Sequence, residues 1–250
     1  MKKVLLSAAL LGGMMFGANA QDEATPASSG YKQEAGNKTI EIRFNPSSIF
    51  NAGAADANNQ FSLFDGLKFR SFTSETSAYR LGVDLTMNSA TAITRQEATD
   101  VTELKTKTSD FSLMLKPGIE KHFASSERLS PYVGAELLIG FKTTTEKEEY
   151  DADATATGND VKEKTSKNGN NGNGYFKLGL GGVAGVDYYF VKKLYIGAEV
   201  QYGLMYTANS KTINEDSGLD GDAAKVETKN GSEFQLTPNV TANIRVGWTF

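Results

Sequence analysis

FQLTPNVTANIRVGWTF, the stretch from Phe234 to Phe250, decides the fold of this chain. Apart from Pro238, every second residue from Phe234 onward is apolar, whereas the residues between them are polar except for Gly247. Side chains of a strand alternate between its two faces, so the pattern predicts one apolar and one polar face over roughly three times the usual strand length. A strand in a bilayer needs an apolar face over about 9–11 tilted residues. The stretch therefore predicts a membrane β-strand that closes a barrel.

The first twenty residues have the three parts of a secretory signal peptide. Lys2 and Lys3 form a positive start, an apolar run follows, and Ala18-Asn19-Ala20 is a small-residue cleavage site. The apolar run is too short for a transmembrane helix, so we expect cleavage before Gln21 rather than a buried N-terminal helix. This divides the chain into a cleaved signal peptide at residues 1–20, a flexible periplasmic lead-in at 21–37 and a barrel domain at 38–250.

Composition excludes several classes of protein. The chain has no Cys, which excludes a disulfide framework and thiolate-metal chemistry. Its net charge is only −4 and no basic face is evident, so no nucleic-acid partner is expected. After the signal peptide no run of eighteen apolar residues occurs, which excludes helical spans.

Eight segments of the chain alternate between apolar and polar residues in the manner of the last one. In the second segment Asp65 interrupts the apolar face beside Gly66, which indicates a bulge or a position at the barrel rim. The eight segments are Thr39–Phe44, about Gln60–Phe72, Tyr79–Met87, Phe111–Phe123, Val133–Phe141, Phe176–Phe190, Ile196–Tyr206 and Phe234–Phe250.

Short and long connections between these segments alternate strictly. The short ones are Thr73–Ser77, Ala124–Ser130 and Val191–Lys193. The long polar ones are Asn51–Asn59, Ser89–Ser109, Thr143–Gly174 and Asn209–Ser232. Outer-membrane barrels have this arrangement, with an even number of strands. The sequence therefore predicts an all-β fold: an eight-stranded antiparallel up-and-down transmembrane β-barrel with short periplasmic turns and long extracellular loops.

Aromatic residues gather on the side of the short turns. We interpret them together as an aromatic girdle at the membrane interface, because such girdles flank the apolar band of membrane barrels. They are Phe72, Tyr79, Phe123, Tyr132, Tyr188, Tyr189, Phe190, Tyr195, Trp248 and Phe250.

One hairpin unit also occurs twice. GIEKHF (Gly118–Phe123) and YVGAEL (Tyr132–Leu137) are matched by GVDYYF (Gly185–Phe190) and YIGAEV (Tyr195–Val200). With these hairpins and the terminal Phe250, the chain from about Lys38 onward resembles the eight-stranded outer-membrane barrels of Gram-negative bacteria, the OmpA-barrel or OmpX-like "porin family".

That resemblance implies an address and a route of assembly. It places the protein in the outer membrane of a Gram-negative bacterium, after export through the inner membrane with a cleaved signal peptide. In this family the barrel-assembly machinery reads a C-terminal strand that ends in Phe, and the matching residues here are Val246, Trp248 and Phe250.

The polar faces of the eight segments carry seven basic and six acidic residues that should point into the barrel. Eight strands leave an interior that side chains fill, and an unpaired buried charge costs several kcal/mol, so near-balanced charges predict a salt-bridge network that plugs the lumen. A narrow path for water, ions or small solutes is the alternative. The residues are Glu41, Arg43, Lys68, Arg70, Arg80, Asp84, Lys116, Glu120, Glu136, Lys177, Asp187, Glu199 and Arg245.

The sequence offers no catalytic or metal motif. His122 is the sole histidine and lies beside a short turn, which favours a structural role. Neither G-x-S-x-G nor H-E-x-x-H nor a phosphate-binding loop occurs, and the acidic clusters Glu146–Glu149 and Asn214–Asp216 lack the spacing of calcium loops. We expect no enzymatic activity, no cofactor and no bound metal.

The expected function is structural, in the cell envelope, or one of surface interaction carried by the extracellular loops. The expected partners are outer-membrane lipid, the assembly machinery, and an extracellular ligand or host surface; the barrel itself should be monomeric, because closure leaves no edge strand. Two alternatives stay open. One is a narrow channel, and the other is a secreted soluble barrel that binds an apolar ligand with its apolar face turned inward.

Overall fold

The structure is a computed structural model that describes residues 30–44, 64–96, 102–123, 125–151, 161–169, 174–217, 223–235 and 241–250. The predicted signal peptide and the Asn51–Asn59 connection lie outside these residues. The described residues contain no helix that is long and apolar enough to span a membrane.

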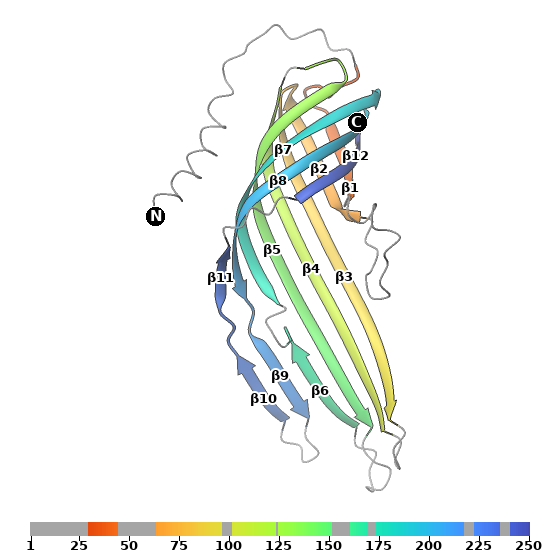
Figure 1. The fold of residues 1–250 in the computed structure, drawn as a ribbon, viewed down its shortest axis with the longest axis vertical. Coiled ribbons are helices and arrows are strands. Elements are labelled where there is room, and N and C mark those ends of the chain that lie inside the picture. The colour runs from red at the N-terminus through yellow and green to blue at the C-terminus, as the bar shows by residue number, and fades with distance from the viewer. Residues whose placement is uncertain are drawn as a thin grey trace.

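Eight strands form a closed ring. Each pairs antiparallel with its neighbours, and the last strand pairs with the first, so the sheet has no open edge at this level. Neighbours in the ring follow one another along the chain, apart from four additional strands that lie in the sequence between the fifth and sixth and between the seventh and eighth ring strands, which confirms the predicted up-and-down barrel (Figure 1). The ring strands are β1 (Lys38–Phe44), β2 (Phe64–Ser74), β3 (Ser77–Gln96), β4 (Thr102–His122), β5 (Leu129–Asp151), β7 (Tyr175–Val191), β8 (Leu194–Asn209) and β12 (Thr241–Thr249).

Beyond the ring the sheet continues as an extension. β6 (Val161–Lys167), β9 (Thr212–Ser217) and β10 (Ala223–Thr228) add successively to the far half of β5, and β11 (Ser232–Gln235) adds to β8. In Figure 1 these strands lie at the opposite end from the C-terminus, beside the lower halves of β3, β4 and β5.

The extension corrects the prediction of long loops. Most of the polar connection Ser89–Ser109 is the far ends of β3 and β4, and the described parts of Thr143–Gly174 and Asn209–Ser232 are largely strands as well. Thr, Lys, Glu and Ser predominate on both faces, with only scattered apolar residues, so these segments lack the apolar–polar alternation by which a strand is detected in sequence. Backbone pairing, rather than burial of an apolar face, holds this part of the sheet together.

The final segment is two strands rather than one. β11 pairs with β8 at Gln235–Met205, and β12 resumes on the same strand at Thr241–Gln201. The chain thus advances six residues while β8 advances four, and two residues are extra. In the sequence Pro238 stands between the two strands, and proline has no N–H to donate to a ladder.

A bulge occurs where Asp65 interrupts the apolar face of β2. Arg43 pairs with Gly66 and Phe44 pairs with Phe64, so Asp65 is the extra residue. Gly66 has a φ of 141°, and a Cβ there would meet the side chains of Asp84 and Arg43. Only glycine combines that backbone with such a close approach. The bulge predicted from the sequence is confirmed.

The apolar face of the ring points outward. Leu180 and Tyr79 are 63% exposed, and Trp248 is 57% exposed. A soluble barrel that holds an apolar ligand would need this face to point inward, so that alternative is wrong. Other exposed apolar residues on this outer face are Ile42, Leu67, Phe69, Leu81, Leu85, Ile119, Leu137, Phe141, Phe176, Leu178, Ile196, Val200 and Val246.

Candidate functional site

Charged side chains fill the ring at the level where it is closed. Every one of the eight ring strands contributes at least one member, and each member is at most 4% exposed. The alternation of side chains along each strand places them inside, because their neighbours in sequence are the outward apolar residues. The members of this central network are Glu41, Lys68, Arg70, Arg80, Glu120, Glu136, Asp187, Glu199 and Arg245.

Arg70 is one hub of the central network. Its Nε lies 2.5 Å from Glu41 Oε1, its Nη1 3.1 Å from Glu120 Oε2 and its Nη2 2.8 Å from Asp187 Oδ2. Arg245 connects two of the same carboxylates, at 2.7 Å from Glu41 and 2.7 Å from Asp187. One guanidinium with several donors in a fixed fork suits this bridging better than an ammonium would.

Arg80 is the second hub. It lies 2.7 Å from Glu120, 2.6 Å from Glu136 and 3.0 Å from Glu199. Lys68 Nζ lies 2.7 Å from the same Glu199, and so the two hubs belong to one continuous network. Since every ion in it has at least one partner of opposite charge, the desolvation cost of burial is offset by pairing.

A second set lies next to the central network, and two of its three members, Asp84 and Lys116, are partly exposed. Asp84 pairs with Arg43 and, at 2.8 Å, with Lys116. Of the thirteen predicted residues only Lys177 lies apart, near the start of β7, with its Nζ 4.1 Å from the centre of the Tyr175 ring. Without Lys177 the predicted set holds six basic and six acidic residues, so the charges that the structure brings together balance.

Glycines let the large side chains of the network approach the barrel wall. A Cβ on Gly197 would meet the carboxylate of Asp187 and the guanidinium of Arg245. A Cβ on Gly247 would meet the ring of Tyr195. The narrow interior therefore depends on positions without a side chain between the charged ones.

The aromatic girdle was predicted with too many members. Tyr79, Tyr188, Phe190, Trp248 and Phe250 do face outward and are exposed. The others, apart from the half-buried Phe123, are buried inside the barrel end at 2% exposure or less, because they share strand parity with the inward charges. The buried ones are Phe72, Tyr132, Tyr189 and Tyr195.

These buried aromatics belong to the network. The Tyr132 hydroxyl donates to Glu199 at 2.5 Å, and the Tyr195 hydroxyl accepts from Arg70 at 2.6 Å. Arg70 also lies 5.1 Å from the centre of the Tyr195 ring. An apolar pair, Leu138 and Val183, is likewise buried on the inner face, so this face carries apolar as well as polar groups.

Gln33 is a buried residue that sequence reasoning missed. It lies in the segment expected to be a flexible lead-in, yet it is only 5% exposed. Its amide nitrogen donates to Ser130 Oγ at 3.0 Å and to the Glu75 carbonyl at 3.3 Å, and its amide oxygen accepts from Tyr189 at 2.8 Å. The second half of the lead-in is therefore anchored, and a single Gln among Lys and Glu residues carries no pattern that could predict this.

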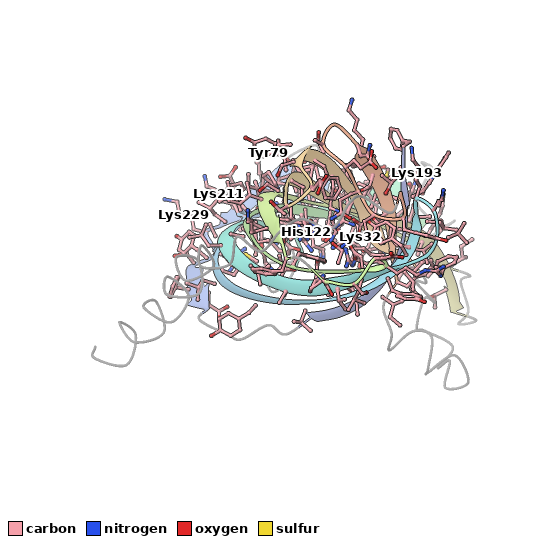
Figure 2. All side chains as sticks on the ribbon, turned by 90° about the horizontal axis from the view of Figure 1, so that it is seen from above. Lys32, Tyr79, His122, Lys193, Lys211 and Lys229 are labelled. Carbon is pink, nitrogen blue, oxygen red and sulfur yellow. The ribbon has the colours of Figure 1, made fainter. Side chains whose placement is uncertain are left out.

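The segment 30–37, which we call the strap, crosses the end of the barrel near the short turns. The Lys193 N–H donates to the Tyr31 carbonyl and the Gly36 N–H to the Phe72 carbonyl. Arg128 stacks on the Tyr31 ring at 4.4 Å. Partial burial lowers the pKa of Lys32, an effect that Glu75 opposes. Figure 2 looks along the barrel and places Lys32 and His122 within the outline of the strands.

His122 joins the strap to the central network. Its Nδ1 lies 2.9 Å from Ser130 Oγ and 3.3 Å from the Gln33 amide nitrogen, and its Nε2 lies 3.1 Å from Glu120. Because Nδ1 faces two donors, the ring proton belongs on Nε2. Ser130, His122 and Glu120 have the spacing of a catalytic relay, but Ser130 is 1% exposed and already accepts from Gln33, so this arrangement anchors the strap.

The acidic clusters of the extension are divided between the two faces of their strands. Their residues alternate between the two faces of β5 and β9, and Glu149 and Glu215 are paired with Lys105 and Lys225. Among the described residues no three His, Cys, Asp or Glu side chains are grouped as metal ligands would be.

The predicted assembly residues lie together on the outer face of the last strand. Val246, Trp248 and Phe250 are 39%, 57% and 55% exposed, and the rings of Trp248 and Phe250 lie 6.1 Å apart. Phe250 also bonds through its backbone to Lys38, where the two chain ends of the barrel domain meet.

Comparison with protein families gives one match. A family model described as "Putative OmpA-OmpF-like porin family" matches residues 56–237, well over half of the chain. Comparison with curated proteins gives no match.

Three solved structures are similar to this chain at low scores. The N-terminal β-barrel domain of Pseudomonas aeruginosa OprF has 14% identity and a TM-score of 0.29, over 87% of this chain and 100% of that one. The outer membrane protein AlkL, studied in DMPC lipid bilayers, has 14% identity and a TM-score of 0.36, over 92% and 97%. A major outer membrane protein from Thermus thermophilus has 13% identity and a TM-score of 0.32, over 87% and 100%. The classification therefore stands on the family match.

Proposed function

The chain belongs to the OmpA-OmpF-like porin family, whose members are outer-membrane β-barrels. From this premise we propose that it is a closed barrel and that its extracellular extension carries its function. In this proposal the barrel anchors the protein in the outer membrane of a Gram-negative bacterium, after export with a cleaved signal peptide. The ion-pair network plugs the lumen, and the role is structural or one of surface interaction rather than enzymatic.

The observation that carries the proposal is the central network. It draws charges from all eight ring strands and buries each of them almost completely. Water in a conducting pore would hydrate such side chains, whereas here Arg70 and Arg245 have direct carboxylate partners. A scaffold of this kind is rigid and offers little room for solutes.

The extension supports the second half of the proposal. Beyond the outward Phe111 and Phe141, whose rings lie 6.5 Å apart, the outer face of β4 and β5 turns polar. The strands nevertheless continue to Thr102 and Asp151. Paired strands on a rigid base present side chains in fixed positions, which suits contact with an external surface.

Membrane fractionation followed by gel electrophoresis with and without boiling tests the anchor. We expect the protein in the outer membrane, with a mobility that changes on boiling because a closed barrel stays folded in unheated detergent. Added protease on intact cells should cleave the extension and spare the barrel. A soluble product without a mobility change would contradict the proposal.

A narrow channel is the second candidate, and the description of the family as porin-like favours it. If the network gates a path, Arg80→Ala and Glu136→Ala should each raise conductance in planar bilayers. Flat traces from the unmodified protein and from both variants would end this alternative and leave the plugged barrel.

The remaining proposals concern assembly and oligomeric state. Val246, Trp248 and Phe250 are proposed to be read by the barrel-assembly machinery, so removal of Phe250 should leave unfolded protein in the periplasm. The protein is proposed to be monomeric, which light scattering in detergent would test.

A further inference from the structure

We propose that three lysines on the outer face of the extension, Lys107, Lys147 and Lys167, bind anionic, phosphate-bearing lipid headgroups of the outer leaflet. The inference rests on the proposed membrane orientation, with the extension outside the cell. It assigns a lipid-binding surface to residues that lie outside the lumen network.

The register of the extension places two of these lysines directly opposite each other. Lys107 on β4 pairs with Lys147 on β5, and both side chains are exposed. Like charges at directly opposed positions of an antiparallel pair repel. Lys167 on β6 pairs with Thr145, two residues before Lys147 on the same face, and is also exposed.

No carboxylate among the described residues lies within ion-pair distance of these three lysines. The acidic groups nearest to them on this face have other partners: Glu149 pairs with Lys105 at 3.3 Å, and Glu215 pairs with Lys225 at 3.4 Å. Glu163, opposite Glu149, also has a partner. The sheet thus pairs most of its outer-face charges and leaves one cluster of three cations available to an external anion.

The position of the cluster matches a membrane surface. The outward aromatic residues Phe111 and Phe141 end the apolar band. Along strands tilted by about 40°, four residues beyond Phe111 and six beyond Phe141 rise roughly 10 and 15 Å, to Lys107 and Lys147. Lysine stems bend toward the headgroup layer while the apolar part stays on the protein surface, so the ammonium groups reach anionic headgroups.

The chemistry of the cluster favours a lipid phosphate over a protein partner. Lysine ammonium groups bind phosphate as point charges without a demanding geometry. The cluster faces sideways, in line with the outward apolar residues of the same strands, and therefore toward lipid rather than away from the membrane. A protein partner would approach the tip of the extension, which lies farther along β4 and β5.

Retention of lipid A by the purified full chain tests the proposal. Protein folded in mixed micelles with lipid A is washed into plain detergent, and the bound lipid is measured as phosphorus. The double variant Lys107→Gln/Lys147→Gln should lose most of the retained lipid A. The double variant Lys211→Gln/Lys225→Gln removes the same charge from lysines that are paired with Glu227 and Glu215, and it should retain the lipid.

Equal retention by the two double variants, whether high or low, would overturn the proposal. Inorganic phosphate serves as the competing probe: if it displaces lipid A at millimolar concentration, the cluster binds a free anion and the lipid assignment is wrong. The boiling-dependent mobility of each variant is measured in parallel. If the unmodified protein shows no mobility change on boiling, the proposed barrel anchor is wrong. If it shows the change but the two double variants retain lipid A equally, only the proposed lipid surface is wrong. Lys107→Gln alone serves if the double variant does not fold.

Discussion

The halves of β4 and β5 inside the ring and the halves beyond it differ in what their two faces carry, although each strand is continuous. Inside the ring, outward Ile119 and Leu137 alternate with inward Glu120 and Glu136. Beyond it, Lys105 and Thr106 face opposite sides and both faces are polar. The backbone pairing is the same in both halves, so the surroundings of the strand set the side-chain pattern. In the proposed orientation these are lipid and the charged lumen within the ring, and water on both sides beyond it.

The comparison implies that charged side chains contribute far more to the free energy of unfolding in the ring than in the extension. Arg245→Met removes one of the buried cationic partners of Glu41 and Asp187, which also pair with Arg70, and we expect a loss of about 3–5 kcal/mol in the free energy of unfolding. Urea unfolding in detergent measures it. Lys225→Met on the exposed β10 is the matched control and should change little. Equal losses in the two variants would abolish the distinction between the regions.

Glycine substitutions compare the two regions by packing rather than charge. Gly197→Ala places a methyl group against Asp187 and Arg245, and overpacking of this kind costs about 1–3 kcal/mol. Gly231, in the extension, has nothing within 4 Å of the position that a Cβ would take, so Gly231→Ala should leave stability unchanged or slightly raised. Thermal unfolding of both variants checks the contrast, and a stable Gly197→Ala protein would mean that the lumen has spare room.

The strap extends the comparison to the end of the barrel near the short turns. Gln33→Ala leaves Ser130 and Tyr189 without the hydrogen bonds that they make to Gln33, which costs about 1–3 kcal/mol and less where water enters from the open end. Limited proteolysis should then cut the lead-in faster. Lys38→Ala, at an exposed side chain, is the control. Unchanged cleavage would show that backbone bonds alone hold the strap.

The smallest effect is expected in the extension. Lys105→Ala breaks an exposed ion pair with Glu149, and such pairs contribute about 0.2–1 kcal/mol. The loss should shrink further at high salt, since screening weakens exposed pairs. Unfolding measured at low and high salt tests this. A loss as large as that of Arg245→Met would place the extension in the cooperative core.

The barrel could be predicted from the sequence because the bilayer imposes a period-2 pattern on each ring strand. The same alternation placed Glu41, Arg70 and Arg245 inside, and the structure brings them together. Which ions pair could not be predicted, because pairing across the lumen depends on the stagger between strands. Tyr132 could have been recognised as inward, since it directly precedes the outward Val133.

Neither the extension nor the strap could be predicted from the sequence, and the reason differs between the two. β6 and β9 are polar on both faces, so water imposes no pattern on them. Gln33 is buried through contacts with residues distant in sequence, and its own neighbours give no sign of it. Burial of a single polar residue is a tertiary property, which a local pattern does not encode.

The pairing of Glu41 with Arg245 also constrains the order of biogenesis. These residues lie 204 positions apart, on the first and last strands of the ring. Synthesis proceeds from the N-terminus, so Glu41 precedes this partner by 204 residues and Asp187 precedes it by 58. Addition of β12 therefore closes the sheet and balances the inward charges in one step, because without Arg245 the set would hold six acidic and five basic residues.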